Sequence, residues 1–426
     1  MKRLLVLFAV GFAVSTAQDN ALEIRGLRTY AFDDEYLPPI VLLGDGITIE
    51  FDVSAKLPPN LQIAFAHASK DWIADKNVFL NEDYHTKSQQ LQFTVAPNGV
   101  HHYSYHYKNA FPDAMDIVRF PYSGNYLFTI YDKDSSGTIL AQGRFIVVEN
   151  AVGTTMRVEN RYYTESISPY NQMHFIEVAV SVPSADNQPI EGRINHPDVK
   201  TVDIIQNWRL MTPFRIDVDE KNPDAYVVES YTPNKRFVIR NVSPGNEYRR
   251  LDIGSARLYP NAEVVRLKEG ADLSRFQWEG KIDANGASKL RPFIGANSDY
   301  LDVEFRLELP SPSDKGIFLV GAFNQWQLSP DCGMHLEPSG NMYSLHKWIR
   351  RGVYDYQYVE ATFDSLSGQF RNEDWLRLEG NDWRTINRYT AVVYCHDPRF
   401  GGFDRAVGTA TAKSPGGTTE AKLNNH

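Results

Sequence analysis

Strict alternation of apolar and polar residues is the main pattern along this chain. Residues 47–53 (ITIEFDV), 176–182 (IEVAVSV) and 301–309 (LDVEFRLEL) place apolar side chains on one face and polar ones on the other, as a half-buried β-strand requires. Further strands are predicted at residues 91–95, 126–131, 145–148, 236–240, 317–320, 354–359 and 389–394. No segment carries a convincing helical stripe of three turns. Many short strands joined by polar turns predict an all-β chain of antiparallel β-sandwiches.

Length and composition suit several such sandwiches. The chain has 426 residues, of which 42% are apolar and 23% charged, so domains of roughly 100 to 130 residues fit three times. We predict three tandem immunoglobulin-like or early-set β-sandwich domains at residues 18–150, 151–290 and 291–408. The first joint is expected at 151–155, and the second near the turn signal DANG at 283–286 and Pro292. Residues 409–426, rich in Thr, Ala, Gly, Asn and Lys, are expected to form a disordered tail.

The first 17 residues predict a secretory signal peptide. Lys2 and Arg3 precede an apolar stretch over residues 4–14, and Ser15-Thr16-Ala17 supplies small residues before a cleavage site. No other stretch approaches 18 apolar residues, so we expect no membrane-spanning helix. The formal net charge is -9 without basic runs, which disfavours nucleic-acid binding. The chain is therefore expected to be exported, soluble and not membrane-spanning.

The two cysteines are Cys332 and Cys395. In an oxidising compartment, two cysteines within one expected domain favour a disulfide. Two separate buried thiols remain the alternative, because the sequence does not fix their distance. Without a CxxC spacing, no structural zinc site is expected.

Motifs for catalysis or metal binding are weak. The chain has no GxSxG, HExxH, P-loop or GxGxxG pattern. His101, His102 and His106 are the best metal candidates, but neighbours in an extended stretch face opposite sides, so an exposed polar loop is favoured. Residues 132–137 (DKDSSG) resemble the start of a calcium loop, yet Gly143 occupies the twelfth position where Glu is needed. We predict no catalytic, cofactor-binding or metal-ligating residues, no cofactor, and a protein that is not an enzyme.

A more specific pattern lies in the third segment. Residues 316–326 (GIFLVGAFNQW) read as a strand ending in G-x-F-N-x-W, followed by 342–348 (MYSLHKW) and 352–359 (GVYDYQYV). This order resembles the early-set immunoglobulin-like modules that bind glycogen and starch. Trp326 is interpreted as a packed cap of the sandwich. Exposed Trp348, Trp375 or Trp383 would be the candidates for stacking on sugar rings.

The ordered motifs of the whole chain resemble one family. They are AHASKDW at 66–72, FPYSGNYLFTIY at 120–131, GRFIVVE at 143–149, NEYRRLD at 246–252, the F-N-x-W turn, YDYQYV at 354–359 and FGGFDRAVG at 400–408. In this order they resemble the type IX secretion system plug proteins of the Bacteroidetes. Ala68 stands where members of that family often have Cys.

The resemblance implies a function that composition alone does not. It implies a non-catalytic periplasmic protein that docks on the periplasmic mouth of the outer-membrane translocon β-barrel and closes the channel when no cargo is present. The protein would be a monomer by itself and peripheral to the inner face of the outer membrane. The alternatives are a periplasmic carbohydrate (glucan)-binding protein that uses the C-terminal domain, and an enzyme with a hidden pair of carboxylates.

Overall fold

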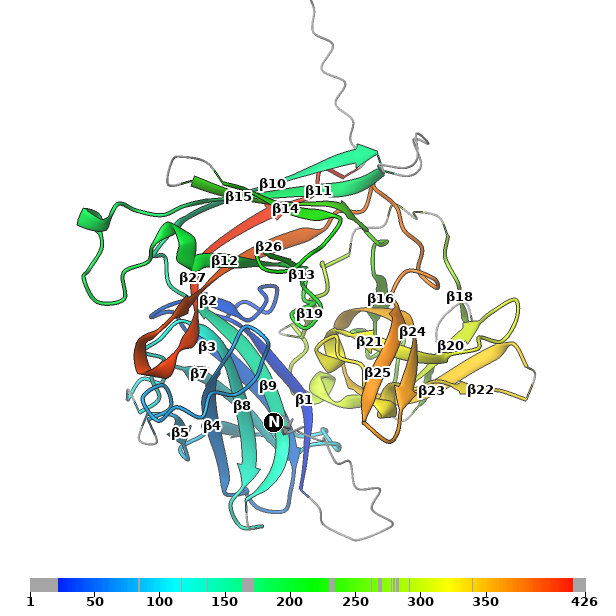
Figure 1. Ribbon diagram of the computed structural model, residues 1–426. Coiled ribbons are helices and arrows are strands. Elements are labelled where there is room, and N and C mark those ends of the chain that lie inside the picture. The colour runs from blue at the N-terminus through cyan, green and yellow to red at the C-terminus, as the bar shows by residue number, and fades with distance from the viewer. Residues whose placement is uncertain are drawn as a thin grey trace, which may run out of the picture.

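The computed structural model describes residues 22–416 apart from 83–84, 116, 136, 163–171, 230–233, 262, 267–269, 277, 279, 281–282, 291 and 339. This part is built from β-strands and short 3-10 turns, and six sheets pack in pairs as three sandwiches (Figure 1). The predicted all-β fold is confirmed. None of its helical turns has the length and apolar character needed to cross a membrane. The predicted signal peptide lies outside the described residues.

The first sandwich encloses a core rich in aromatic rings. One sheet has the strand order β1-β3-β7-β6 and the other β2-β9-β8-β4-β5, with β2 and β9 parallel. Between the sheets, Phe65 packs edge-on against Phe111 and Phe120. The strands are β1 (Glu23–Ala31), β2 (Ile40–Leu42), β3 (Ile47–Ser54), β4 (Leu61–Ala68), β5 (Lys87–Ser88), β6 (Phe93–Val95), β7 (Tyr105–Phe111), β8 (Gly124–Asp132) and β9 (Thr138–Val148).

The middle sandwich combines strands from two distant parts of the chain. Its sheets have the orders β10-β11-β15-β14 and β13-β12-β26-β27. In Figure 1 the orange and red strands β26 and β27 lie beside the green strands of this sandwich. Its elements are β10 (Gly153–Tyr162), β11 (Gln172–Ser181), β12 (Val199–Gln206), β13 (Phe214–Asp217), β14 (Ala225–Glu229), β15 (Asn234–Val242), β26 (Arg388–Asp397), β27 (Phe403–Lys413), η1 (Ala185–Asn187), η2 (His196–Asp198) and η6 (Arg399–Gly401).

The third sandwich is inserted between β15 and β26 of the middle one. Strand β24 pairs with β16, β19, β21 and β25, and the facing sheet has the order β17-β20-β23-β22, with β18 beside β20. Its elements are β16 (Arg249–Asp252), β17 (Val265–Arg266), β18 (Asp272–Leu273), β19 (Ser288–Lys289), β20 (Tyr300–Glu308), β21 (Gly316–Gly321), β22 (His335–Leu336), β23 (Met342–Arg350), β24 (Val353–Asp364), β25 (Gln369–Asp374), η3 (Gly295–Ser298), η4 (Ala322–Asn324) and η5 (Pro330–Cys332).

This insertion corrects the predicted tandem boundaries at 290 and 408. Strands β16 to β19, expected in the middle domain, pair within the third sandwich, and β26 pairs with β12 of the middle sandwich. Residues 409–413, expected in a disordered tail, complete β27 and pair with β26. Their composition offers little apolar surface, but the neighbouring strand supplies the backbone hydrogen bonds that hold them.

The same rearrangement separates the cysteines. Cys395 lies on β26 in the middle sandwich, whereas Cys332 lies on η5 in the third. Both are free and buried, so the predicted disulfide is wrong. Burial raises the pKa of the Cys395 thiol to about 12, which keeps it protonated and unreactive at neutral pH.

Candidate functional site

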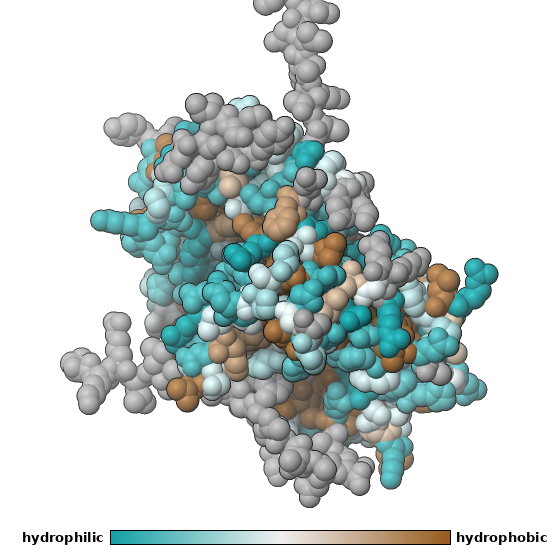
Figure 2. Space-filling model, turned by 90° about the vertical axis from the view of Figure 1, so that its right-hand side faces the viewer, coloured by the Kyte–Doolittle hydropathy of each residue, from teal (hydrophilic) through white to brown (hydrophobic). Residues whose placement is uncertain are grey.

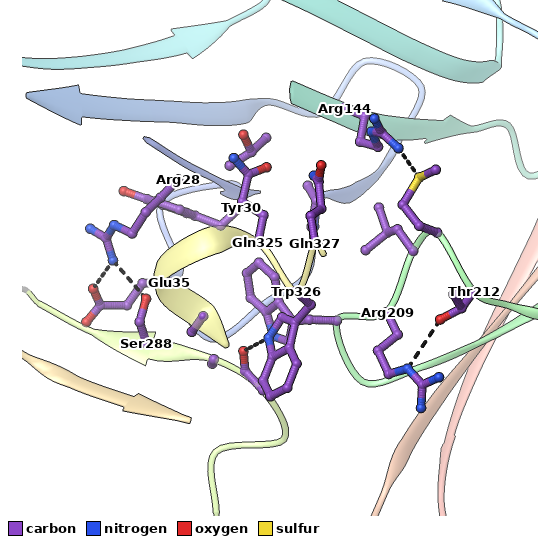
Figure 3. A pocket seen from close by; sticks show the side chains of 18 residues that line it. Arg28, Tyr30, Glu35, Arg144, Arg209, Thr212, Ser288, Gln325, Trp326 and Gln327 are labelled. Carbon is purple, nitrogen blue, oxygen red and sulfur yellow. Dashed lines mark hydrogen bonds and ion pairs between the residues drawn. The ribbon is translucent and has the colours of Figure 1, made fainter. Parts of the chain in front are cut away.

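All three sandwiches meet around one small cavity. Its walls come from β1 and its following loop, from the loop after β12, from the segment before β19, and from the F-N-x-W turn after β21 (Figure 3). The cavity measures about 40 Å³, which is room for about two or three water molecules. It is therefore a packed joint between domains and too small for a sugar or a cofactor.

The F-N-x-W turn forms the third-sandwich wall of this joint. Asn324 fixes the turn, because its Oδ1 accepts from the Gly321 amide (2.9 Å) and its Nδ2 donates to the Leu319 carbonyl (3.2 Å). Trp326 is only 4% exposed, its Nε1 donates to the Gly286 carbonyl at 2.8 Å, and its ring lies 4.2 Å from that of Tyr248. The interpretation of Trp326 as a packed residue is confirmed, although it joins domains instead of capping one end.

Buried charges join the first and third sandwiches. Asp52 on β3 is 1% exposed and accepts from Arg350 Nη1 at 3.0 Å and from the Tyr300 hydroxyl at 2.8 Å, both on third-sandwich strands. Beside it, Arg28 pairs with Glu50 at 2.7 Å. Burial alone would raise the pKa of Glu50, but Arg28 and its neighbours lower it to about 2. Glu50 therefore stays ionised, because its buried partner Arg28 favours the charged form.

The polar positions of the strand at 47–53 thus face a neighbouring domain. Thr48, Glu50 and Asp52 are as buried as the apolar residues between them. Alternation predicted the strand correctly but gave no sign that its polar face is covered. The signal available in the sequence was the pair of carboxylates, Glu50 and Asp52, on the same face of this strand.

Four of the motifs that suggested a family, at 66–72, 120–131, 143–149 and 400–408, converge where the first and middle sandwiches meet. The Lys70 amide donates to Asp404 Oδ2 (2.9 Å), the Tyr394 hydroxyl donates to Asn125 Oδ1 (2.8 Å), and Arg405 pairs with Glu149 (2.7 Å). Apolar residues continue this contact: Ile146, Val148, Ile205, Leu210, Val392, Tyr394 and Ala406, with Ile40 and Trp72 against them. Residues far apart in the sequence therefore act together as one interdomain joint.

Close packing restricts one glycine in this joint. Gly124 has a φ of +144°, and a Cβ atom there would collide with the His67 ring and lie 2.8 Å from the Asp404 carbonyl oxygen. His67 is fully buried, with Nδ1 2.6 Å from Asp75 and Nε2 3.0 Å from the Ser123 carbonyl. The S-G-N sequence at the start of β8 lets the two sandwiches approach this closely.

The histidine candidates do not form one site. The amides of His101 and His102 donate to Asp299 of the third sandwich at 2.9 and 3.1 Å, so this loop clamps the domains together. His106 Nδ1 lies instead 2.7 Å from Asp52. Within the described residues no group of three or more His, Cys, Asp or Glu side chains is arranged to hold a metal ion. Residues 132–137 connect β8 to β9, as a hairpin turn does.

Two of the three tryptophan candidates for sugar stacking contact protein side chains. Trp348 is 51% exposed and its ring lies 4.5 Å from the His102 ring. The Trp375 ring lies 4.2 Å below the Arg209 guanidinium. Trp383 is partly buried. The Trp348 and Trp375 rings already pack on neighbouring residues, which leaves less of each ring face open for stacking on a sugar.

One chemical feature escaped the sequence analysis. Glu247, Asp283 and Asp355 gather near the chain crossings between the middle and third sandwiches, and burial raises the pKa of each. The sequence marks the DANG turn and the YDYQYV strand separately, but no pattern in it indicates that they lie together.

Comparisons with known proteins agree with the fold and with the first domain. Residues 24–149 match the family model described as the type 9 secretion system plug protein, first domain. A crystal structure of a hypothetical protein from Parabacteroides merdae is similar over 92% of this chain and 97% of that chain, with a TM-score of 0.71 and 21% identity. No curated protein matches the sequence. The likeness of the C-terminal segment to glycogen-binding modules stays a prediction.

Proposed function

We propose that this protein is a non-catalytic plug of the type IX secretion system. In this proposal it docks on the periplasmic mouth of the outer-membrane translocon barrel and closes the channel when no cargo is present. The observation that carries the proposal is the match of residues 24–149 to the first domain of such plug proteins. That segment coincides with the first sandwich from β1 to β9.

The joints between the sandwiches support the proposal that this protein acts as a stopper. A body that closes a wide channel must keep its shape under load, and domains linked only by flexible connections would not. Here the first sandwich is fixed to the third by the Asp52–Arg350 pair and to the middle one by the Arg405–Glu149 pair. Backbone hydrogen bonds add to this, since the Glu149 and Ala151 amides donate to carbonyls of β27.

The exposed surface offers groups for docking. On the face drawn in Figure 2, apolar side chains lie in small groups among polar ones. In the first sandwich, several apolar side chains on loops are exposed: Leu57, Ile73, Val78, Phe79 and Met115 are 77%, 68%, 70%, 60% and 69% exposed. Such residues contribute to interfaces that are non-covalent and reversible, as displacement by cargo requires. Export through the leader at residues 1–17 would bring the protein to the periplasm.

Two experiments test the proposal. Affinity purification of the full chain from solubilised outer membranes should recover a very large β-barrel protein. Deletion of the gene should make cells permeable to a large antibiotic or dye, and removal of the translocon as well should restore the barrier. Permeability that is unchanged in the single deletion, or that persists without the translocon, would overturn the plug function. Tight binding to glucans would favour the carbohydrate alternative.

A further inference from the structure

The connection between the middle and third sandwiches contains a buried carboxylate. The chain leaves the middle sandwich after β15 and returns to it before β26. Glu247, on the outgoing segment, is 3% exposed, and its Oε1 accepts from the amide of Ile386 on the returning segment at 2.9 Å. This one side chain therefore bridges both crossings.

Two more carboxylates complete the cluster. Asp283 accepts at 2.5 Å from the amide of Tyr248, the residue after Glu247. The Glu247 and Asp283 carboxyls are therefore close enough to repel each other when both are ionised. Asp355 on β24 is 1% exposed and accepts from the Ala284 and Gly286 amides at 2.7 and 2.9 Å. The three side chains thus tie the outgoing segment, the turn before β19 and the central strand of the third sandwich together.

Burial and mutual repulsion favour a proton on this cluster. Neighbouring buried carboxylates resist ionising together, because burial disfavours the charged form and like charges repel. Burial and repulsion by Asp283 raise the pKa of Glu247 to about 7 and that of Asp355 to about 7. Burial also raises the pKa of Asp283. The cluster therefore changes charge close to neutral pH.

Nearby cations offset this charge only in part. Arg275 donates to the Glu247 carbonyl at 2.8 Å, but it also pairs with Glu379 at 2.7 Å. Arg249 is paired with the same Glu379 at 3.0 Å. The charged and titratable groups that face the cluster are Arg275, Arg250, Arg249, Glu379 and Tyr248.

We propose that Glu247, Asp283 and Asp355 form a proton-dependent latch that holds the third sandwich on the middle one. The latch is closed while the cluster holds a proton and loosens when all three carboxyls ionise and repel each other. Its state reaches the three-domain joint, because the Gly286 amide donates to Asp355 while its carbonyl accepts from Trp326. The inference does not depend on the plug function, since it concerns the shape of the molecule alone.

Distance measurements between spin labels on the full chain test the latch. Ile190 and Leu366 are 90% and 98% exposed on the middle and third sandwiches, and both native cysteines are buried, so cysteines introduced at 190 and 366 take the labels. Below pH 7 we expect one narrow distance. Above pH 8 we expect loss of this narrow distance and a shift to a broad distribution. An identical distribution at both pH values overturns the proposal.

Variants separate the latch from a general effect of pH. Glu247→Gln keeps an acceptor for the Ile386 amide and carries no charge at any pH. It removes the repulsion with Asp283, so it should retain the narrow distance at both pH values. Glu263→Gln, on an exposed residue of the third sandwich, is the matched control and should broaden as the parent protein does. A Glu247→Gln variant that broadens like the control would refute the latch. If Glu247→Gln does not fold, Asp355→Asn provides the same test.

Discussion

Removal of Arg350 tests the joint between the first and third sandwiches. Arg350 ends β23, its side chain is 13% exposed, and its Nη1 lies 3.0 and 3.2 Å from the two carboxylate oxygens of Asp52. In the Arg350→Ala variant, Asp52 stays buried without its cation. Removing one partner of a buried ion pair costs about 3–5 kcal/mol. Asp52 keeps hydrogen bonds to Tyr300 and His106, so we expect the lower end, about 3 kcal/mol, of a total of about 5–15.

Equilibrium urea unfolding followed by tryptophan fluorescence measures this loss. Arg266→Ala is the matched control, because Arg266 also lies in the third sandwich and pairs with Glu304 at 2.7 Å, but its side chain is 71% exposed. The control should cost only about 0–1 kcal/mol. Asp52→Asn combined with Arg350→Ala should recover part of the loss by removing the orphaned charge. Equal effects of Arg350→Ala and Arg266→Ala would refute an ionic joint.

The remaining predictions address the core, the joint and pH. Phe305→Asp should unfold the third sandwich, because Phe305 is 0% exposed and an unpaired buried carboxylate costs several kcal/mol, whereas Glu304→Lys should change the urea midpoint little; equal effects would contradict the register of β20. Gly124→Ala should lower the melting temperature, because the added methyl collides with His67; an unchanged value would show that the joint adapts. The pKa of Glu247 is raised to about 7, compared with about 4.3 in the unfolded chain, so between these pH values the folded state binds more protons than the unfolded state. The free energy of unfolding should therefore fall as pH rises through that window. In pH-dependent denaturation Glu247→Gln should flatten this slope, and an unaltered slope would assign it to other groups.

Local pattern determined the strands of this protein. The alternating segments 47–53, 176–182 and 301–309 fall on β3, β11 and β20, and their ends differ from those of the strands by a few residues at most. This works because the two-residue period of a strand depends only on neighbours along the chain. The same local signals identified the F-N-x-W turn and the motifs that now meet at the joint of the first and middle sandwiches.

Long-range pairing decided the rest. Which sheet a strand joins depends on a partner that the local pattern does not identify. The sequence pattern therefore assigns β26 and β27 to the wrong sandwich and predicts Cys395 near Cys332. For the same reason the alternating pattern predicts that Asp52 faces solvent, whereas in the structure it is buried against Arg350. Burial by another domain changes the energy of a charge far more than its sequence neighbours do, and only the tertiary structure shows where this occurs.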